Sequence, residues 1–433
     1  MSRLNAPTPI APLAVWRIAF GLLMLAESWG AIATGWVRAN FIEPTFHFTH
    51  MDVAGWLAPL PGAGMYAYFG VMGLAALGVA LGWRYRFCAV ALAVLWTGAY
   101  LMQKTSYNNH YYLAVLLCWG MCLVPADRAV ALTDKPRAAA YARWIRVLAQ
   151  AQLLIVFTFG ALAKLYPGWL SGDFIHQSFT RKAGLPVLGP LLQEDWFQDF
   201  ITYGAVAFDA LVIPLLMWRP TRGLAFVGLV GFNLFNSVVF QIGIFPYLVL
   251  AMTVFFFDPE AVGRWFRVPP APAGGVAVVG RIGGPGKALL ALYLAVQVAL
   301  PLRHHLIAGD VNWTEEGHRL AWRMMSRAKS GTVRIEVVDP ATGAVERVDP
   351  RDHLTAKQAS RLTTKPDFMW QYARYLRELY AARGVPDAEV YARRSRVWLN
   401  GVGPAPLFRD SVDLASVPYH RWSHNPWVYE RAE

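Results

Sequence analysis

The sequence predicts an α-helical polytopic membrane protein with about eight or nine transmembrane helices, followed by a C-terminal extramembrane α+β domain. Of its 433 residues, 56% are hydrophobic and 14% are aromatic, and the mean hydropathy is +0.33. Only 16% of the residues are charged, whereas about 25% are charged in ordinary soluble domains. The 18 Trp and 18 Tyr residues are typical of a bilayer protein with aromatic belts at its interfaces.

Nine apolar stretches are candidates for the transmembrane helices. A helix that crosses the bilayer needs roughly 17–25 largely apolar residues. The candidates are residues 12–34, 64–82, 86–103, 110–125, 145–164, 203–218, 223–240, 244–257 and 286–302. The pair of stretches around Gln241–Gly243 is short, so it predicts either a helical hairpin or a re-entrant element.

The Lys and Arg residues between these stretches predict their orientation, because cytoplasmic loops carry an excess of both. The connections after the odd-numbered stretches hold four of them: Arg38, Lys104, Arg181 and Lys182. The connections after the even-numbered stretches hold thirteen: Arg84, Arg86, Arg128, Lys135, Arg137, Arg143, Arg146, Arg219, Arg222, Arg264, Arg267, Arg281 and Lys287. We therefore expect a cytoplasmic N-terminus and an extracytoplasmic segment after the ninth stretch.

The chain changes character after the ninth stretch, which predicts a transmembrane domain over residues 1–302 and a second domain over residues 303–433. Val333–Val338 and Ala344–Val348 are β-type stretches, and the Asp339–Gly343 segment between them has the composition of a turn. Residues 367–383 have aromatic and apolar residues near helical spacing and are followed by Gly384, a typical stop signal. We expect an extracytoplasmic α+β domain packed on the outer membrane face.

The formal net charge of +12 is explained by topology rather than by nucleic-acid binding. The sequence has no phosphate-binding loop and no Cys or His pairs at zinc-finger spacing. The adjacent His304 and His305 point in different directions and have no further ligands at useful spacing, so we expect no metal site. The three cysteines, Cys88, Cys118 and Cys122, lie in or beside apolar stretches and predict no disulfide.

Lys164 ends a nearly uninterrupted apolar run, Val147–Ala163. One interpretation is a lysine whose ammonium group reaches the lipid headgroups. The other is a partly desolvated amine, whose charged form is disfavoured and which can act as a base near neutral pH. The run alone favours the first interpretation.

Other polar residues stand at the ends of stretches that the predicted topology places on the same membrane face. In Lys104–Tyr112, Asn108 or Asn109 can cap a helix, or the polar residues can contribute to a site with His110. Asn233 and Asn236 share a helix face, which suits either a helix–helix hydrogen bond or a ligand contact. Because all these polar residues are expected at the same, outer membrane face, they favour an outward-facing cavity.

Several of these segments resemble the vitamin K-dependent gamma-glutamyl carboxylase family. Lys104-Thr-Ser-Tyr-Asn-Asn-His110 is similar to a Lys-Thr-Ser-Trp-Asn-Asn-His stretch of that family. Phe159–Gly172 resembles the segment around its catalytic lysine, and Asn236–Tyr247 resembles its quinone-pocket segment. The matches continue through Leu300–His304, Asn312–Thr314 and Trp322–Met325, so they extend from about residue 100 to the C-terminus. The chain is identified as a bacterial homologue, of the type with a horizontally transferred transmembrane domain.

The resemblance implies a reaction that uses reduced vitamin K or a menaquinol-type naphthoquinone, with O2 and CO2 as co-substrates and no metal. Oxygenation of the quinol provides a base strong enough to deprotonate the γ-carbon of glutamate, and the quinone epoxide is the by-product. Such chemistry requires protection from water, which favours a pocket at membrane depth. A lipid quinol reaches such a pocket through the bilayer, and a peptide reaches it from the aqueous side.

The resemblance also assigns roles to individual residues. Lys164 matches the base that deprotonates the hydroquinone, and His110 with Asn109 matches residues that support its oxygenation. Residues implied in binding the quinone are Tyr107, Asn108, Asn236, Phe245, Tyr247, Met324 and Met325. Residues implied in handling the substrate glutamate are His304, His318 and Trp322.

The expected partners are membrane lipid and a glutamate-containing peptide or protein. A quinone-reducing enzyme is a further possible partner, and nucleic acid is not expected to bind. The expected location is a bacterial inner membrane. Three alternatives stay open at this point: a quinol epoxidase without carboxylation, a non-catalytic quinone- or lipid-binding membrane protein, and a transporter. The sequence shows no evident internal repeat, which disfavours the transporter.

Overall fold

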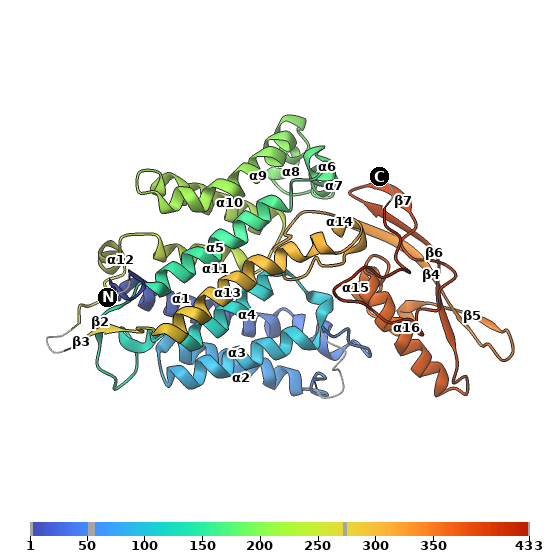
Figure 1. Cartoon of the computed structure of the whole chain (residues 1–433), viewed down its shortest axis with the longest axis horizontal. Helices are drawn as coiled ribbons and strands as arrows, with labels where there is room; N and C mark the ends of the chain where they lie inside the picture. The colour runs from blue at the N-terminus through green and yellow to red at the C-terminus, as the bar shows by residue number, and fades with distance from the viewer. Residues whose placement is uncertain (1–2, 51–56, 272–274, 432–433) are drawn as a thin grey trace. The chain divides into compact units, whose positions relative to one another are not determined.

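The computed structural model describes residues 3–50, 57–271 and 275–431, shown in Figure 1. The chain forms two compact units. The first consists of Met1–Ile42, Thr49–Thr158 and Ala207–Val298. The second consists of Glu43–Phe48, Phe159–Val206 and Ala299–Glu433. The second unit therefore includes residues 159–206, which no sequence pattern had connected with the C-terminal region.

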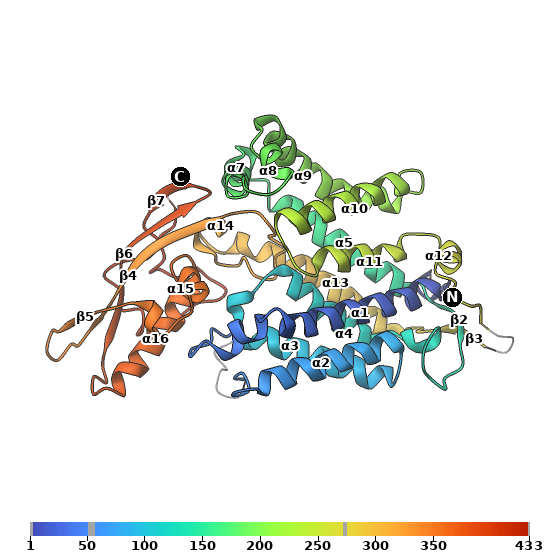
Figure 2. The ribbon, with the colours of Figure 1, turned by 180° about the vertical axis from the view of Figure 1, so that it is seen from behind.

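Long apolar helices build the first unit. Helices α1 to α4 pack side by side in chain order, and α1 also contacts α11 and α12, as Figures 1 and 2 show from opposite sides. The helices are α1 (Ala11–Ala33), α2 (Gly64–Leu81), α3 (Tyr85–Met102), α4 (Asn109–Leu123), α5 (Trp144–Leu162), α9 (Asp195–Met217), α10 (Arg222–Val239), α11 (Phe245–Met252), α12 (Pro259–Trp265) and α13 (Gly284–Leu302). Three of them, α5, α9 and α13, have part of their residues in the second unit.

The described residues contain seven helices that are long and apolar enough to cross a membrane, or up to eight if α11 and α12 form one broken span. The segments Phe245–Phe255 and Pro259–Trp265 are bent by 118° at the break between them, so the predicted stretch 244–257 ends at this bend. The fourth predicted stretch, residues 110–125, corresponds to α4, which has 15 residues. At 1.5 Å per residue its length is about 22 Å, less than the ~30 Å hydrocarbon core. Helix α9 begins eight residues before the predicted 203, because polar residues such as Gln198 and Asp199 fill its first turns.

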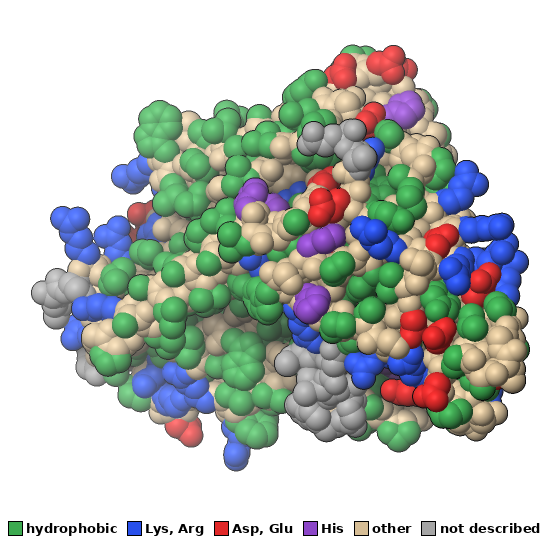
Figure 3. Space-filling view, turned by 45° about the vertical axis from the view of Figure 1, so that its right-hand side comes forward, with side chains coloured by type: hydrophobic (Ala, Val, Ile, Leu, Met, Phe, Trp, Pro, Cys, Tyr) green, Lys and Arg blue, Asp and Glu red, His purple; other side chains and the backbone are tan. Residues whose placement is uncertain are grey.

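The surface of the helical part is apolar. Phe87 on α3 is 72% exposed and Leu224 on α10 is 79% exposed, and Figure 3 shows hydrophobic side chains over much of the visible surface. Soluble proteins rarely expose large contiguous apolar patches. The fold is therefore that of a polytopic integral membrane protein, as predicted.

A small sheet, which the sequence analysis did not anticipate, lies at one end of the first unit. Its strands are β1 (Pro7–Pro9), β2 (Ala138–Ala142) and β3 (Val276–Val279). Strand β2 pairs with β1 in the antiparallel sense and with β3 in the parallel sense. Because the strands precede α1, α5 and α13, the sheet holds the N-terminal ends of these three helices together.

The second unit contains the predicted α+β fold. Its antiparallel sheet has the order β5-β4-β6-β7. The strands are β4 (Lys329–Val338), β5 (Val345–Val348), β6 (Glu389–Leu399) and β7 (Val402–Ala405), and the helices are α6 (Pro167–Leu170), α7 (Asp173–Thr180), α8 (Leu188–Leu192), α14 (Val311–Thr314), α15 (Ala356–Leu362) and α16 (Pro366–Ala381).

Local sequence explains the elements that were predicted in this unit. Val338 pairs with Val345 across the predicted hairpin. In its turn, Asp339 accepts a hydrogen bond of 2.7 Å from the Thr342 hydroxyl, and Gly343 has a φ of +73°. Helix α16 matches the predicted helix over 367–383, and Gly384 follows it with a φ of +94°. A positive φ is accessible to glycine without a Cβ clash.

The core of the second unit is formed by the sheet and α16. Phe368 and Tyr372 of α16 are buried against it together with Val390 of β6. Phe48, from the short segment Glu43–Phe48, joins this core, where its ring centroid lies 4.5 Å from that of Phe368. This contact explains why the segment belongs to the second unit although its neighbours in sequence belong to the first.

Candidate active site

The turn between α3 and α4 carries the first predicted group of site residues. Asn108 is the N-cap of α4, and its side-chain oxygen accepts a hydrogen bond of 2.7 Å from the Tyr111 N–H. The capping interpretation of Asn108 is thereby confirmed, and its quinone contact stays a prediction. The Tyr107 hydroxyl donates a hydrogen bond of 3.0 Å to the side-chain oxygen of Asn109. Tyr107 and Asn109 are thus fixed against each other at the start of the helix.

His110 and Phe245, from two separate predicted segments, lie in contact. Their ring centroids are 4.5 Å apart, and His110 is only 9% exposed while Phe245 is buried. The Nδ1 atom of His110 has no hydrogen-bond partner among the described residues. A buried polar atom without a partner is destabilising by about 1–3 kcal/mol, and buried polar atoms are usually satisfied. The contact shows that the α3–α4 and α10–α11 turns meet at one end of the first unit.

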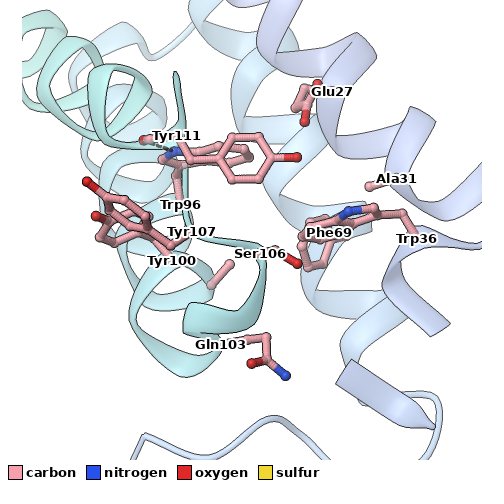
Figure 4. Close-up of a pocket in the computed structure, with 11 residues that line it drawn as sticks. Glu27, Ala31, Trp36, Phe69, Trp96, Tyr100, Gln103, Ser106, Tyr107 and Tyr111 are labelled. Atoms are coloured by element: carbon pink, nitrogen blue, oxygen red, sulfur yellow. Dashed lines mark hydrogen bonds between the residues drawn. The ribbon is translucent and has the colours of Figure 1, made fainter. Parts of the chain in front are cut away.

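A small pocket lies beside the same turn, lined by Trp36, Phe69, Tyr107 and Tyr111, among others. Figure 4 shows these side chains, with the Tyr111 hydroxyl directed toward Glu27. Its volume is about 20 Å³, which is enough for about one water molecule. The pocket is therefore too small for a quinone ring.

The predicted residues of α10 and α11 have different environments. Asn233 is buried, and its Nδ2 donates a hydrogen bond of 2.8 Å to the Leu229 carbonyl of its own helix. Asn236 is half-buried, and Tyr247 is 46% exposed. The roles of Asn236 and Tyr247 in quinone binding stay predictions.

Lys164 lies in the second unit, just after the end of α5, and only 5% of it is exposed. Its Nζ donates a hydrogen bond of 3.1 Å to the Gly160 carbonyl and lies 5.4 Å from the centroid of the Trp169 ring. Trp169 is itself buried and donates a hydrogen bond of 2.9 Å to the Thr202 carbonyl. Lys164 is therefore a buried amine held in a tight turn. This burial contradicts the interpretation of a lysine extended into the headgroup region.

Tyr166 connects the Lys164 turn with the segment that contains Met324 and Met325. The Tyr166 hydroxyl donates a hydrogen bond of 2.6 Å to the Ser326 carbonyl and accepts one of 2.7 Å from Asn400 Nδ2. Asn400 Nδ2 also donates to the Gly168 carbonyl at 2.9 Å. Two of the predicted motifs, far apart in the sequence, are thus joined by two residues that sequence reasoning had not assigned.

The Trp322–Met325 segment has an unusual backbone. Trp322 and Met325 have φ values of +54° and +48°, a region that non-glycine residues rarely occupy. Trp322 is fully buried, while Met324 and Met325 are half-buried. Strained backbone is retained only where the surroundings fix it, and it is concentrated at functional sites.

A cluster of charges surrounds Glu315 in the second unit. Arg327 binds the Glu315 carboxylate with two hydrogen bonds, and Lys365 Nζ donates another at 3.0 Å. Lys329 Nζ lies 3.8 Å from the same carboxylate. Burial alone raises the pKa of Glu315, but the neighbouring cations, Arg327 first among them, hold the pKa well below its usual range. Three cations around one carboxylate leave a surplus of positive charge.

The two predicted histidines of the second unit have distinct settings. His304 is half-buried, and its Nδ1 lies 2.7 Å from the Pro301 carbonyl while its ring centroid is 4.0 Å from that of His305. His318 is buried beside Glu315. Burial lowers the pKa of His318 well below its usual range, although Glu315 opposes this effect. No group of three or more His, Cys, Asp or Glu side chains that could hold a metal occurs within the described ranges.

Two family models match the chain. The HTTM domain matches residues 5–261, and the vitamin K-dependent gamma-carboxylase, lumenal domain, matches residues 285–433. The chain belongs to the vitamin K-dependent gamma-carboxylase family. The resemblance inferred from the sequence motifs is thereby confirmed, and no solved structure matches the chain.

Membership in the gamma-carboxylase family sets the general function and cofactor. It supports a gamma-carboxylase-like enzyme and implies vitamin K as cofactor. The lumenal-domain match includes the whole sheet of the second unit together with Trp322, Met324 and Met325. The HTTM match includes His110, Lys164 and Phe245.

Proposed function

We propose that this chain carboxylates the γ-carbon of glutamate side chains, coupled to conversion of a reduced naphthoquinone to its epoxide with O2 and CO2. The observation that carries the proposal is the buried position of Lys164, which holds an amine in an apolar turn beside Trp169. In this proposal Lys164 Nζ accepts a proton from a quinol hydroxyl. When bound, the quinol supplies with O2 the base that removes the glutamate proton.

The side chains at the His110 end of the first unit suit a quinol. Phe245 offers an apolar ring, and the unsatisfied Nδ1 of His110 offers a hydrogen bond to a quinol oxygen. Asn109 is held by Tyr107. We assign His110 and Asn109 the role of orienting the quinol and its oxygenation, and Phe245, Met324 and Met325 the role of apolar contacts. Binding in a buried setting also keeps water away from the reaction.

The proposed second substrate is a glutamate-containing peptide or protein. The surplus positive charge of Arg327, Lys329 and Lys365 around Glu315 supports the attraction of another carboxylate. His318 contacts Glu315, and Trp322 follows His318 by four residues in the sequence. We assign His304, His318 and Trp322 to the handling of the substrate glutamate.

The proposed orientation has the N-terminus in the cytoplasm of a bacterial inner membrane and the C-terminal domain outside. The alternation of Lys and Arg between the apolar stretches supports it. A reporter that is active only in the cytoplasm, fused after Glu433, should be inactive. Activity of that fusion would reverse the orientation.

The proposal is tested with purified protein, reduced naphthoquinone, O2, labelled CO2 and a glutamate-containing peptide, with epoxide and fixed label followed separately. Lys164→Ala should reduce epoxide formation at least 100-fold, the usual range for loss of a general base, while the thermal unfolding temperature stays close to that of the wild type. Lys182→Ala, at a half-buried lysine of the same unit, is the control and should retain activity.

Three results would change the assignment. Epoxide without fixed label would retain quinol oxygenation and remove carboxylation of that peptide. Quinone binding without epoxide in the wild type would leave a non-catalytic quinone-binding protein. Full activity of Lys164→Ala would remove the lysine from the mechanism.

A further inference from the structure

A large cavity lies in the first unit, at the end that carries the β1–β2–β3 sheet. Its volume is about 380 Å³, and it is lined by residues of α1, α4, α5 and α13 together with Met252 and Phe255. This volume is within the range of about 300–1,000 Å³ typical of small-molecule sites. None of the residues predicted for the active site lines it.

The mouth of the cavity faces lipid. Trp119 and Leu123 of α4 and Leu289 of α13 line the cavity and are also exposed on the surface of the helices. Exposed apolar side chains on such helices contact the hydrocarbon of the bilayer. A molecule that enters between α4 and α13 must therefore be soluble in the membrane.

The polar end of the cavity is near the middle of the helices. Trp144 begins α5, and Gln152 follows eight residues later, at a distance of about 12 Å along the axis. Tyr293 is about 14 Å from the start of α13 at Gly284. Both side chains are therefore close to half the depth of a hydrocarbon core of about 30 Å.

Gln152 has an unused hydrogen-bond donor at this depth. The Tyr293 hydroxyl donates a hydrogen bond of 2.6 Å to Gln152 Oε1. Gln152 is 3% exposed, and its Nε2 has no hydrogen-bond partner among the described residues. No charged side chain is present among the described residues that line the cavity. The cavity thus offers one uncharged hydrogen-bond donor, which suits a ligand with an uncharged hydrogen-bond acceptor.

We infer that this cavity is a second lipid site, which binds the ring of an oxidised isoprenoid naphthoquinone with a ring carbonyl accepting a hydrogen bond from Gln152 Nε2. An acyl chain has no acceptor at this depth and would leave Nε2 unsatisfied. A charged phospholipid headgroup would find no counter-charge in the lining. The aromatic walls formed by Trp16, Trp144 and Phe255 suit a planar ring. The choice of a naphthoquinone as the lipid rests on the proposed function.

A line of buried polar side chains continues from this site toward His110. Gln297 lies one helical turn after Tyr293 on α13, and its Nε2 donates a hydrogen bond of 3.0 Å to the Tyr112 hydroxyl. Tyr112 is two residues after His110 on α4. The second site therefore lies on a path within the first unit from lipid toward the candidate active site, where it holds quinone between the membrane and the reaction.

The inference is tested by photolabelling the wild-type protein in lipid nanodiscs with an azido-1,4-naphthoquinone that carries a short isoprenoid chain. Peptides that contain residues 116–124 and 286–293 should be labelled. Gly120→Phe should reduce this labelling at least 10-fold, because a Cβ at Gly120 meets no atom within 4 Å and the ring fills the cavity. Gly231→Phe is the matched control, since Gly231 on α10 is exposed, equally open and outside the lining.

Gln152→Leu tests the hydrogen bond and should weaken labelling about 10-fold, as expected for the loss of one hydrogen bond to a buried donor. If Gly120→Phe does not fold, Gln152→Leu alone tests the inference. Unchanged labelling in Gln152→Leu, or loss of a co-purified phospholipid instead of quinone in Gly120→Phe, would overturn the inference. Labelling is measured without turnover, so it is independent of the epoxide assay. If the proposed catalysis fails, the labelling result can still be interpreted.

Discussion

Tyr166 and Ser326 are 160 residues apart in the sequence, and the Tyr166 hydroxyl donates a hydrogen bond of 2.6 Å to the Ser326 carbonyl. The same hydroxyl accepts a hydrogen bond from Asn400. Tyr166 is two residues from Lys164, and Ser326 directly follows Met325. One phenol therefore fixes the turn of the proposed base against the strained segment of the lumenal domain.

Tyr166→Phe should weaken this connection, because the Ser326 carbonyl loses its donor and Asn400 loses an acceptor. We expect the free energy of unfolding to fall by about 1–3 kcal/mol and epoxide formation to fall about 10-fold as the Lys164 turn loosens. Both are measured on protein in detergent. Tyr203→Phe is the control, since Tyr203 is exposed and its hydroxyl donates a hydrogen bond of 3.2 Å to the Leu170 carbonyl, far from the Ser326 segment in sequence. Equal effects of the two variants would contradict the positioning role of Tyr166.

His110→Leu should separate activity from stability. The substitution keeps an apolar side chain of similar size against Phe245 and removes a buried nitrogen that has no partner among the described residues. The unfolding temperature should therefore stay equal or rise, while epoxide formation should fall at least 10-fold. A variant that is less stable but fully active would show that His110 is an ordinary core residue.

Much of the fold was accessible from sequence because its causes are local. The apolar stretches are long enough to be identified one by one. The Asp339–Gly343 turn and the helix end at Gly384 are each determined by the residue types at those positions. The sheet of β1, β2 and β3 was not, because Pro7–Pro9 is too short to give a strand pattern. The stretch 110–125 was counted as a span because its composition is apolar, although the helix that forms there, α4, has only 15 residues.

The candidate site was accessible only in part. The motifs around His110 and Lys164 indicated the family, and the contact between His110 and Phe245 agrees with the topology expected for their segments. The bonds of Tyr166 and Asn400 were not accessible, because a single sequence does not indicate which distant residues meet. The lipid cavity was not accessible either, because it is lined mainly by ordinary apolar residues, and only the polarity of Gln152 in an apolar run was a signal.

Lys329→Met should change the pH dependence of stability. Burial lowers the pKa of Lys329 to about 7, with Glu315 opposing the shift and Lys365 and Arg327 adding to it. In the unfolded chain the pKa of a lysine is about 10.4. Between these values the unfolded state holds more protons than the folded state, so the free energy of unfolding rises with pH by up to about 1.4 kcal/mol per unit.

The variant lacks this contribution, so its unfolding temperature should rise less between pH 7 and pH 9 than that of the wild type. The slope is the measurement, because the loss of the hydrogen bonds from Lys329 Nζ to the Trp313 and Thr364 carbonyls lowers stability at every pH. Lys365 remains in both proteins, and burial lowers its pKa to about 8. Parallel slopes would show that Lys329 stays protonated in the folded protein throughout this range.

Arg146→Met should destabilise the broken span at the end of α11. Arg146 Nε donates a hydrogen bond of 2.7 Å to the Phe255 carbonyl, and Nη2 donates bonds of 3.1 Å to the carbonyls of Phe256 and Phe257. These carbonyls lie at the 118° bend, where no continuing helix supplies their donors. Loss of the guanidinium removes the side-chain donor of the Phe256 and Phe257 carbonyls, while Gln150 Nε2 still donates a hydrogen bond of 2.9 Å to the Phe255 carbonyl. We therefore expect a loss of roughly 2 kcal/mol or more.

Arg143→Met is the matched control for this effect, because Arg143 is exposed and lies three residues earlier in the chain. An exposed substitution of this kind changes stability by about 0.5 kcal/mol or less. Thermal unfolding of both variants in the same detergent measures the difference. If the two variants unfold together, the bend is held by the packing of α1 against α11 and α12 rather than by Arg146, and the break in the span is a property of its own sequence.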